Sequence, residues 1–126
     1  RWDRALSFEG ETGPYVQYTH ARCCSVLRKA EAYKDAQPNY DVLCDDEALE
    51  VLMQLSRFPE TVRKAMEQNE PCLITRHVTS LAQAYNKYYF EHRIMDENDA
   101  AGTCARVRLT DAVRDVIKLF KPAENV

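Results

Sequence analysis

Aromatic, amide and cationic side chains recur at helical spacing in two parts of this sequence. Within each set the residues lie three or four positions apart, so a helix would place them along one stripe of its surface. Aromatic rings stack on unpaired bases, amides and arginines bond to base edges, and cations bind phosphates. Two such stripes on one face would suit single-stranded nucleic acid. The candidates are Tyr15, Tyr18 and Arg22 in the first set, and Asn86, Tyr89 and Arg93 in the second, with Tyr85 and His92 at its margin.

Each of these residues also has an ordinary structural interpretation. A tyrosine at helical spacing is more often a core residue with one hydroxyl partner than a platform for a base, and this alternative stays open for Tyr85 and Tyr88. Asn86 could bond across neighbouring helices, and Arg22 could bind a phosphate instead of a base. His20 falls on an apolar stripe, which favours a structural role.

Charge is unevenly distributed along the 126 residues, although the net charge is only −3. Residues 35–70 contain nine acidic and three basic side chains, whereas residues 14–34 and 72–94 are mainly basic. This pattern predicts a polarised molecule if the basic segments share a face. Mixed, solvated helix surfaces would give the same composition.

The five cysteines, at positions 23, 24, 44, 72 and 104, form no C-x-x-C pair. An odd count with two adjacent cysteines argues against a disulfide framework and favours reduced thiols in the cytoplasm. A zinc site that combines His20 with Cys23 or Cys24 has the wrong ligand spacing. We therefore expect no metal site, and no apolar run is long enough to span a membrane.

Helix signals account for most of the chain. Pro14 suits the first turn of a helix, Asp45 and Asp46 are good N-caps, and Pro59 and Pro71 each favour a new helix. These signals predict helices over 14–35, 45–57, 59–69, 71–92 and 103–120. The fold expected is all-α, an antiparallel bundle of about five helices over 14–126, preceded by a connector over 1–13.

The apolar spacing within these helices predicts the core. The positions expected to be buried are Val16, His20, Cys23, Leu27 and Ala30, then Ala48, Leu49, Leu52, Met53 and Leu55, then Val62, Ala65 and Met66, then Ile74, Val78, Leu81, Tyr85 and Tyr88, and finally Leu109, Ala112, Val113, Val116, Ile117 and Phe120.

The run FEGETGPYVQYTHAR at residues 8–22 resembles the start of the anticodon-binding domain of arginyl-tRNA synthetases, which carries GxTGPYxQYxHxR. FPETV at 58–62, LAQAYNKYY at 81–89, ARVRL at 105–109 and AVR at 112–114 resemble later motifs of that domain, in the same order. One departure is that KLF at 118–120 meets a proline about six residues earlier than in the family.

The resemblance implies a role in holding arginine tRNA. In the family, the residues that match Tyr89 and Arg93 face the anticodon, and ATP and Mg²⁺ bind in a separate catalytic domain. Because no catalytic motif of that domain occurs in this chain, we expect no catalytic residue and no cofactor here. The expected partners are tRNA(Arg) and the catalytic domain of the same enzyme, which we expect to be a cytoplasmic monomer.

Two other functions stay open from the sequence. The bundle could be a protein-interaction domain with no RNA role. A small helical enzyme that uses His77, His92 and the cysteines is the remoter alternative, because these residues are scattered over separate predicted helices with no motif.

Overall fold

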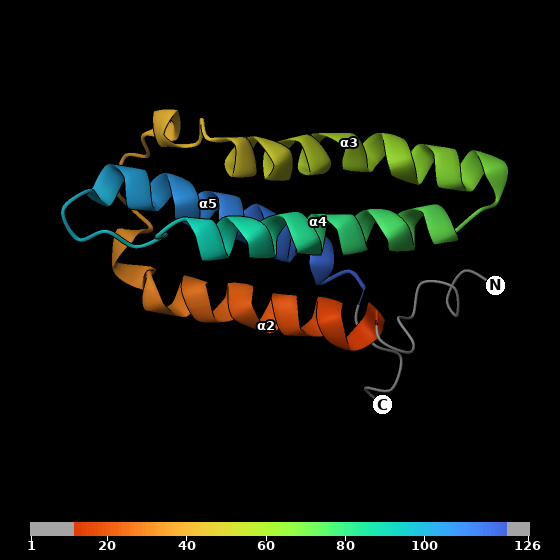
Figure 1. Cartoon of the computed structure of the whole chain (residues 1–126), viewed down its shortest axis with the longest axis horizontal. Coiled ribbons are helices and arrows are strands. Elements are labelled where there is room, and N and C mark those ends of the chain that lie inside the picture. Colours follow the sequence, from red (N-terminus) through yellow and green to blue (C-terminus); the bar gives the residue numbers. More distant parts are fainter. Residues whose placement is uncertain (1–11, 121–126) are drawn as a thin grey trace.

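The computed structural model describes residues 12–120, which form four long helices and two short 3₁₀ helices (Figure 1). Consecutive long helices run in opposite directions, with α2 and α3 on opposite flanks of α4 and α5. The predicted all-α fold is confirmed. Within residues 12–120, no helix combines the length and apolarity needed to cross a bilayer. The elements are α2 (Thr12–Lys29), η1 (Glu31–Tyr33), η2 (Tyr40–Val42), α3 (Asp46–Gln68), α4 (Cys72–Glu91) and α5 (Ala100–Ile117).

The first described helix, α2, ends earlier than the sequence predicts. It stops at Lys29 and not near Asp35, and the chain continues through η1. Tertiary contacts explain the difference, because the segment after η1 is tied to the start of α5. The Asn39 amide donates to the carbonyl of Ala101 at 3.0 Å, and the Cys104 thiol lies 3.2 Å from the Ala36 carbonyl. Much of the predicted connector, residues 1–11, lies outside the described part.

Pro59 does not end a helix, so the prediction of two helices over 45–69 is wrong. It lies inside α3, where it removes a backbone donor. Packing against α4 holds the helix together on both sides of the proline. The His77 ring donates from Nε2 to the Gln54 carbonyl at 2.7 Å, and its Nδ1 lies 2.7 Å from the Thr61 hydroxyl. The ring of Phe58 packs edge-on against His77 at 5.6 Å.

We expect Pro59→Ala to stabilise the protein by about 1–2 kcal/mol, because alanine restores the missing helical hydrogen bond and removes the ring's clash. Part of the gain is offset by greater freedom of the unfolded chain. Urea unfolding monitored by circular dichroism measures the change. Pro71→Ala is the matched control, since Pro71 is at the N-cap of α4, where its missing donor costs little. A loss of stability in Pro59→Ala would contradict this explanation.

The ends of α3 follow the sequence signals. The carboxylate of Asp45 accepts the Ala48 amide at 2.9 Å, as predicted for an N-cap. At the other end, Asn69 takes a left-handed conformation with φ 53°, which closes the helix. The helix α4 then spans residues 72–91, close to its predicted bounds.

The last helix begins earlier than residue 103, where the sequence signals predict it to start. The helix begins at Ala100, and Asp99 caps it by accepting the Gly102 amide at 2.9 Å. A Cβ atom on residue 102 would lie 2.2 Å from a carboxylate oxygen of Asp99. A side chain at this position would therefore have to displace the capping carboxylate of Asp99.

The core lies between α4 and the helices around it. All five core positions predicted in α4 are buried, as are Val16 and Cys23 in α2, Ala30 directly after α2, and most of the set predicted for the last helix. In α3 the prediction is confirmed for Ala48 and Ala65 but is wrong for four large apolar side chains, which are exposed: Leu49, Leu52, Met53 and Met66. The helix is covered mainly by α4, so it has only a narrow buried stripe, formed by Ala48, Val51 and Ala65.

Candidate nucleic-acid interface

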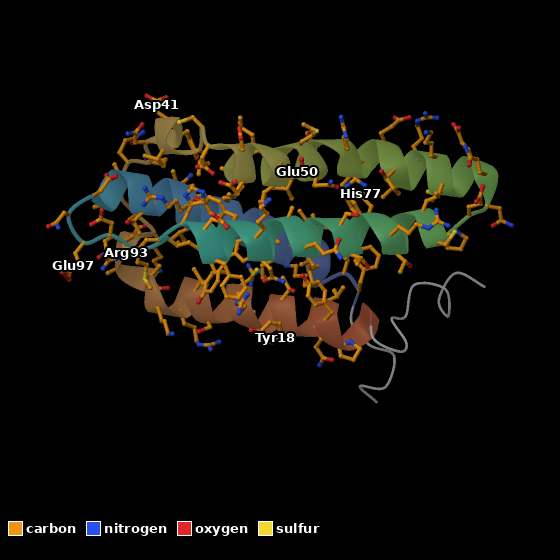
Figure 2. All side chains as sticks on the ribbon, viewed as in Figure 1. Tyr18, Asp41, Glu50, His77, Arg93 and Glu97 are labelled. Atoms are coloured by element: carbon orange, nitrogen blue, oxygen red, sulfur yellow. The ribbon has the colours of Figure 1, made fainter. Side chains whose placement is uncertain are left out.

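A hollow of about 810 Å³ lies between the outer face of α2 and the end of α4. One side is a stripe of α2 in which Tyr18, Arg22, Ser25 and Lys29 are separated by three or four residues. The other side is the last turn of α4 and the segment up to residue 97. In Figure 2, Tyr18 marks the α2 side, and Arg93 and Glu97 mark the end of the bundle where α4 gives way to the loop before α5. The side chains from this second part are Tyr89, His92, Arg93, Ile94, Met95 and Glu97.

The Arg22 guanidinium joins the two helices at this hollow. Its central carbon lies 4.2 Å from the centre of the Tyr89 ring and 4.8 Å from the rings of Tyr18 and Phe90. Such distances allow cation–π attraction. Its two terminal nitrogens donate to the Asn86 side chain, at 2.8 Å, and to the Tyr18 hydroxyl. The two stripes predicted from spacing therefore meet on one side of the molecule.

These aromatic rings differ in how much of each is accessible. Tyr18 is 55% exposed and Phe90 is 74% exposed. Tyr89 is half-buried and packs against the edge of the core. Together with the planar guanidinium they form an apolar and cationic surface that is partly open to solvent, which we call the Arg22 cluster (Tyr18, Arg22, Tyr89 and Phe90). A nucleobase can stack on aromatic and guanidinium planes of this kind.

Tyr85 lies elsewhere, and its assignment to the binding surface is wrong. It is fully buried, and its hydroxyl lies 2.9 Å from the Thr110 hydroxyl of α5. Burial is the main cause that raises the pKa of Tyr85.

Tyr15 is half-buried beneath the Arg22 cluster, where its hydroxyl accepts a hydrogen bond from Asn86 at 3.0 Å. Asn86 itself is only 6% exposed, so the structural alternative describes it better than direct contact with a base.

His92 borders the hollow, but its ring is held by other groups. Its Nε2 lies 2.7 Å from a Glu47 carboxylate oxygen and 2.9 Å from one of Asp45, and its ring stacks on Tyr88 at 5.0 Å. The three ligand atoms lie within 4.8 Å of one another, as in a metal site. A helix N-terminus disfavours a cation there, and hydrogen bonding to the imidazole accounts for the arrangement. We assign His92 to the link between α4 and α3.

This link predicts a pH dependence of stability. The hydrogen bond from His92 holds the pKa of the Glu47 carboxyl below its ordinary value. A carboxyl whose pKa is lowered by folding stabilises the protein at a pH above its pKa in the unfolded chain, about 4.3. This stabilisation is lost as the pH falls through the pKa that the carboxyl has in the folded protein. In the wild type, protonation of this carboxyl below about pH 4.3 therefore lowers the stability. Glu47→Gln has no carboxyl at this position, so we expect its stability to fall less over the same pH range. Thermal melts from pH 3 to 7 measure it, with the exposed Glu50→Gln as control; identical profiles for wild type and Glu47→Gln would contradict the assignment.

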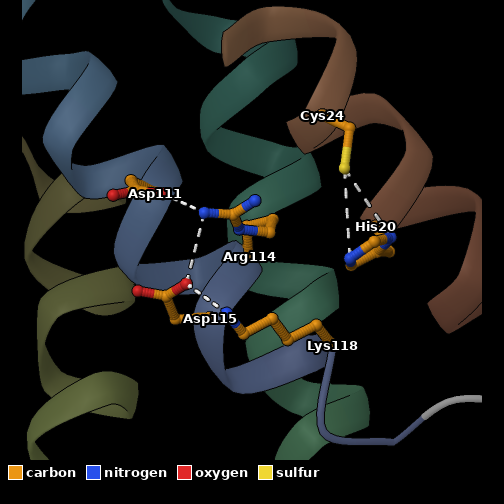
Figure 3. Close-up of polar contacts among 6 residues, drawn as sticks. All are labelled: His20, Cys24, Asp111, Arg114, Asp115 and Lys118. Carbon is orange, nitrogen blue, oxygen red and sulfur yellow. Dashed lines mark hydrogen bonds and ion pairs between the residues drawn. The ribbon is translucent and has the colours of Figure 1, made fainter. Parts of the chain in front are cut away.

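The charged residues at the rim of the hollow are mainly basic. Lys29 and Arg93 are exposed on opposite sides, whereas Glu97 is the one acidic side chain among the described lining residues. Two cations at the C-terminal end of α5, Arg114 and Lys118, differ, because carboxylates compensate them. Arg114 lies 2.7 Å from Asp111 and 3.3 Å from Asp115, and Lys118 lies 3.3 Å from Asp115 (Figure 3). Uncompensated positive charge suitable for a phosphate is thus found at the hollow and not along the end of α5.

Comparison with known proteins identifies the family of this chain. Residues 16–120 match the DALR anticodon binding domain, so the match covers most of the sequence. The chain belongs to the DALR anticodon-binding domain family. It is 46% identical to the arginine–tRNA ligase of Alkaliphilus metalliredigens over 118 residues, which is 94% of this chain and 21% of that protein. It is 52% identical to the arginine–tRNA ligase of Enterococcus faecalis over 116 residues, 92% of this chain and 20% of that protein.

The DALR domain thus spans about one fifth of the length of the curated relatives it matches. The resemblance drawn from the residue 8–22 run agrees with this result, although residues 8–11 lie outside the described part of the chain. No solved structure matches this sequence.

Among the residues that sequence reasoning missed in this DALR domain are Lys29, which lines the hollow, and Phe90, which belongs to the Arg22 cluster. Lys29 lies seven residues after Arg22, so an extended helical stripe from Tyr18 would have included it. Phe90 lies four residues after Asn86 and three before Arg93, so helical spacing allowed it in the second stripe, although it follows Tyr89 directly. It reaches the Arg22 cluster only because α4 brings two consecutive aromatic side chains to the surface near its end.

The cysteines of the DALR domain are all unpaired. Cys23 is buried among α4 and α5, and burial raises the pKa of its thiol to about 12, so that it stays protonated. Its neighbour Cys24 points the other way, with its sulfur 3.8 Å from Nδ1 of His20 (Figure 3). Because adjacent residues on a helix point in different directions, Cys23 and Cys24 do not converge with His20 as ligands of one metal would.

Proposed function

We propose that the hollow between α2 and the end of α4 binds unpaired nucleotides of the anticodon loop of arginine tRNA. The observation that carries this proposal is the Arg22 cluster, in which the guanidinium lies 4.2 Å from the Tyr89 ring and joins the two predicted stripes. Membership in an anticodon-binding family supports nucleic acid as the ligand. The high sequence identity to arginine–tRNA ligases supports arginine tRNA as the nucleic acid that is bound.

The geometry suggests which residues of the site bind the base and which bind the phosphates. A hollow of about 810 Å³ is within the range of small-ligand sites, which bury a molecule of roughly one or two nucleotides. The exposed faces of the Arg22 cluster can stack a base, while Lys29 and Arg93 are positioned for the phosphates that flank it. Glu97 repels phosphate, so it favours a strand path along the two basic residues.

The proposal places this chain in an arginine–tRNA ligase whose catalytic part lies outside the sequence described here. That enzyme would attach arginine to tRNA with ATP and Mg²⁺ bound in the catalytic part. In this proposal the chain acts in the cytoplasm, the enzyme is a monomer, and the DALR domain contributes tRNA binding and no reacting group. The remote enzymatic alternative has little support, since His77 is bound between α3 and α4 and His92 at the start of α3.

Salt-dependent binding tests the proposal. We expect the chain to bind a fluorescent anticodon stem-loop of arginine tRNA, with log affinity falling linearly with log salt by about 0.7 for each phosphate neutralised. Lys29→Gln and Arg93→Gln should each lower the magnitude of that slope by nearly the value expected for one phosphate contact. Arg28→Gln is the matched control, because Arg28 is exposed beside Lys29 but does not line the hollow.

Binding that does not depend on unpaired bases is the competing result. A hairpin with the same stem and a tightly structured tetraloop should bind much more weakly, because its bases are not available for stacking. Equal affinity for the two hairpins, or an equal slope change in Arg28→Gln, would contradict a site that reads unpaired nucleotides in this hollow. The apolar residues exposed on α3 would then favour the protein-interaction alternative.

A further inference from the structure

Asn86 is a buried polar side chain at the contact between α2 and α4. An amide costs free energy to bury unless its hydrogen bonds are made. Here they are made to three residues of α2: the oxygen accepts from Arg22 at 2.8 Å, and the nitrogen donates to the Tyr15 hydroxyl at 3.0 Å and to the Thr19 hydroxyl oxygen at 2.9 Å. One side chain of α4 thus bonds to side chains on successive turns of α2.

The direction of each bond in this network is fixed by chemistry. Arginine has only donors, so the amide oxygen must face Arg22. The Thr19 hydroxyl donates to the Tyr15 carbonyl of its own helix at 3.0 Å, which leaves its oxygen to accept from Asn86. The network therefore needs an acceptor and a donor at position 86 in this orientation. An apolar side chain supplies neither, and aspartate supplies the acceptor for Arg22.

The consequence is seen at Arg22. Both of its terminal nitrogens donate to protein groups, one to Asn86 and the other to Tyr18. The central carbon of the guanidinium lies within 4.8 Å of the centres of three aromatic rings. Its two terminal nitrogens, from which arginine usually clamps a phosphate, are engaged by Asn86 and Tyr18. Lys29 and Arg93, which are exposed on the rim, make no comparable contact between helices within residues 12–120.

From this geometry we propose that Asn86 is a positioning residue, which locks Arg22 into the Arg22 cluster as part of a stacking platform and leaves phosphate binding to Lys29 and Arg93. The inference rests on the proposed function for its ligand, and it assigns Arg22 a role different from the phosphate contact that its charge alone suggests. A platform already ordered in the free domain binds more tightly because less side-chain freedom is lost on binding.

The test compares Asn86→Leu, which removes the acceptor, with Asn86→Asp, which keeps it. Affinity for the anticodon stem-loop is measured over a salt series at a temperature where urea melts show each variant to be folded. We expect Asn86→Leu to weaken binding by about tenfold, near the cost of ordering one long side chain, with no change in the salt slope. Asn86→Asp should stay within about threefold of the wild type, because it still holds Arg22.

A double-mutant cycle separates positioning from general damage. In an Arg22→Met background, Asn86→Leu should cause no further loss of affinity, and Arg22→Met alone should leave the salt slope unchanged. Equal losses from Asn86→Leu in both backgrounds would overturn the positioning role. A slope reduced by a full phosphate contact in Arg22→Met would overturn the platform role.

A measurement on the free chain keeps this inference distinct from the proposed function. The side-chain NMR signals of Arg22 should show ring-current shifts in the wild type and in Asn86→Asp, and should lose them in Asn86→Leu. If the wild type shows these shifts but binds no stem-loop, the proposed function fails while the hold of Asn86 on Arg22 stands. If the Arg22 signals are the same in all three proteins, the inference fails whatever the RNA result.

Discussion

Tyr89→Ala is expected to weaken binding of the anticodon stem-loop by about 1–3 kcal/mol, or roughly 5- to 150-fold. The ring of Tyr89 lies 4.2 Å beneath the Arg22 guanidinium and packs against Phe90 at 5.8 Å, so its removal takes away the centre of the Arg22 cluster. Fluorescence anisotropy at fixed salt measures the loss. Helical content should be unchanged, because Tyr89 is only half-buried.

Tyr89→Phe is the matched control for this result. It keeps the ring and removes only the hydroxyl. Within residues 12–120, the contacts that hold the Arg22 cluster together involve the Tyr89 ring and not its hydroxyl. Affinity should then stay within about threefold of the wild type. Full binding by Tyr89→Ala would remove Tyr89 from the site, and an equal loss in Tyr89→Phe would show that the hydroxyl, and not the stacking surface, contacts the RNA.

Tyr85→Ala should destabilise the fold by about 3–5 kcal/mol, the usual cost of truncating a fully buried aromatic side chain. Tyr85 has no exposed surface and bonds to Thr110 across the bundle at 2.9 Å. Urea unfolding measures the change. Tyr85→Phe should cost only about 1 kcal/mol, because the ring volume is kept and Thr110 can still donate to the Arg106 carbonyl.

The two tyrosines thus have opposite expected phenotypes although they are four residues apart on α4. Tyr85→Phe should bind RNA as the wild type does, and its loss should appear only in stability. A Tyr85→Phe protein that is as stable as the wild type but binds RNA poorly would contradict the assignment of Tyr85 to the core. It would instead return Tyr85 to the binding surface predicted from its spacing.

Periodicity predicted the parts of the fold where a helix is surrounded by others. In α4, every apolar position expected inside is buried, from Ile74 to Tyr88. In α3 the same reasoning placed Leu49, Leu52 and Met53 in the core, and they are exposed. A flanking helix covered chiefly by one neighbour buries only a narrow stripe, and the number of neighbours cannot be read from the residues of one helix.

Local rules also failed where tertiary contacts override them. Pro59 has the sequence signature of a helix boundary, yet α3 continues because His77 and Phe58 fix the helix on both sides of it. The sequence contains no local sign of this support, since His77 lies 23 residues away from Gln54, the residue whose carbonyl it contacts.

The site was predictable in outline but not in its details. Helical spacing correctly grouped Tyr18 with Arg22 and Tyr89 with Arg93, and the structure brings both pairs to one hollow. Spacing could not separate Tyr85 from Tyr89, because both are compatible with the stripe. It also could not reveal that Arg22 bonds to Asn86, a contact between residues 64 positions apart that depends on how α2 and α4 pack.

An NMR titration of the ¹⁵N-labelled chain with the anticodon stem-loop of arginine tRNA tests the binding surface most directly. The largest shifts should map to the hollow, at Tyr18, Arg22, Lys29, Tyr89 and Arg93, while the exposed α3 residues Leu49, Met53 and Met66 remain unchanged. Shifts centred on α3, or none at saturating stem-loop concentration, would contradict the claim that the face shared by α2 and α4 grips unpaired nucleotides.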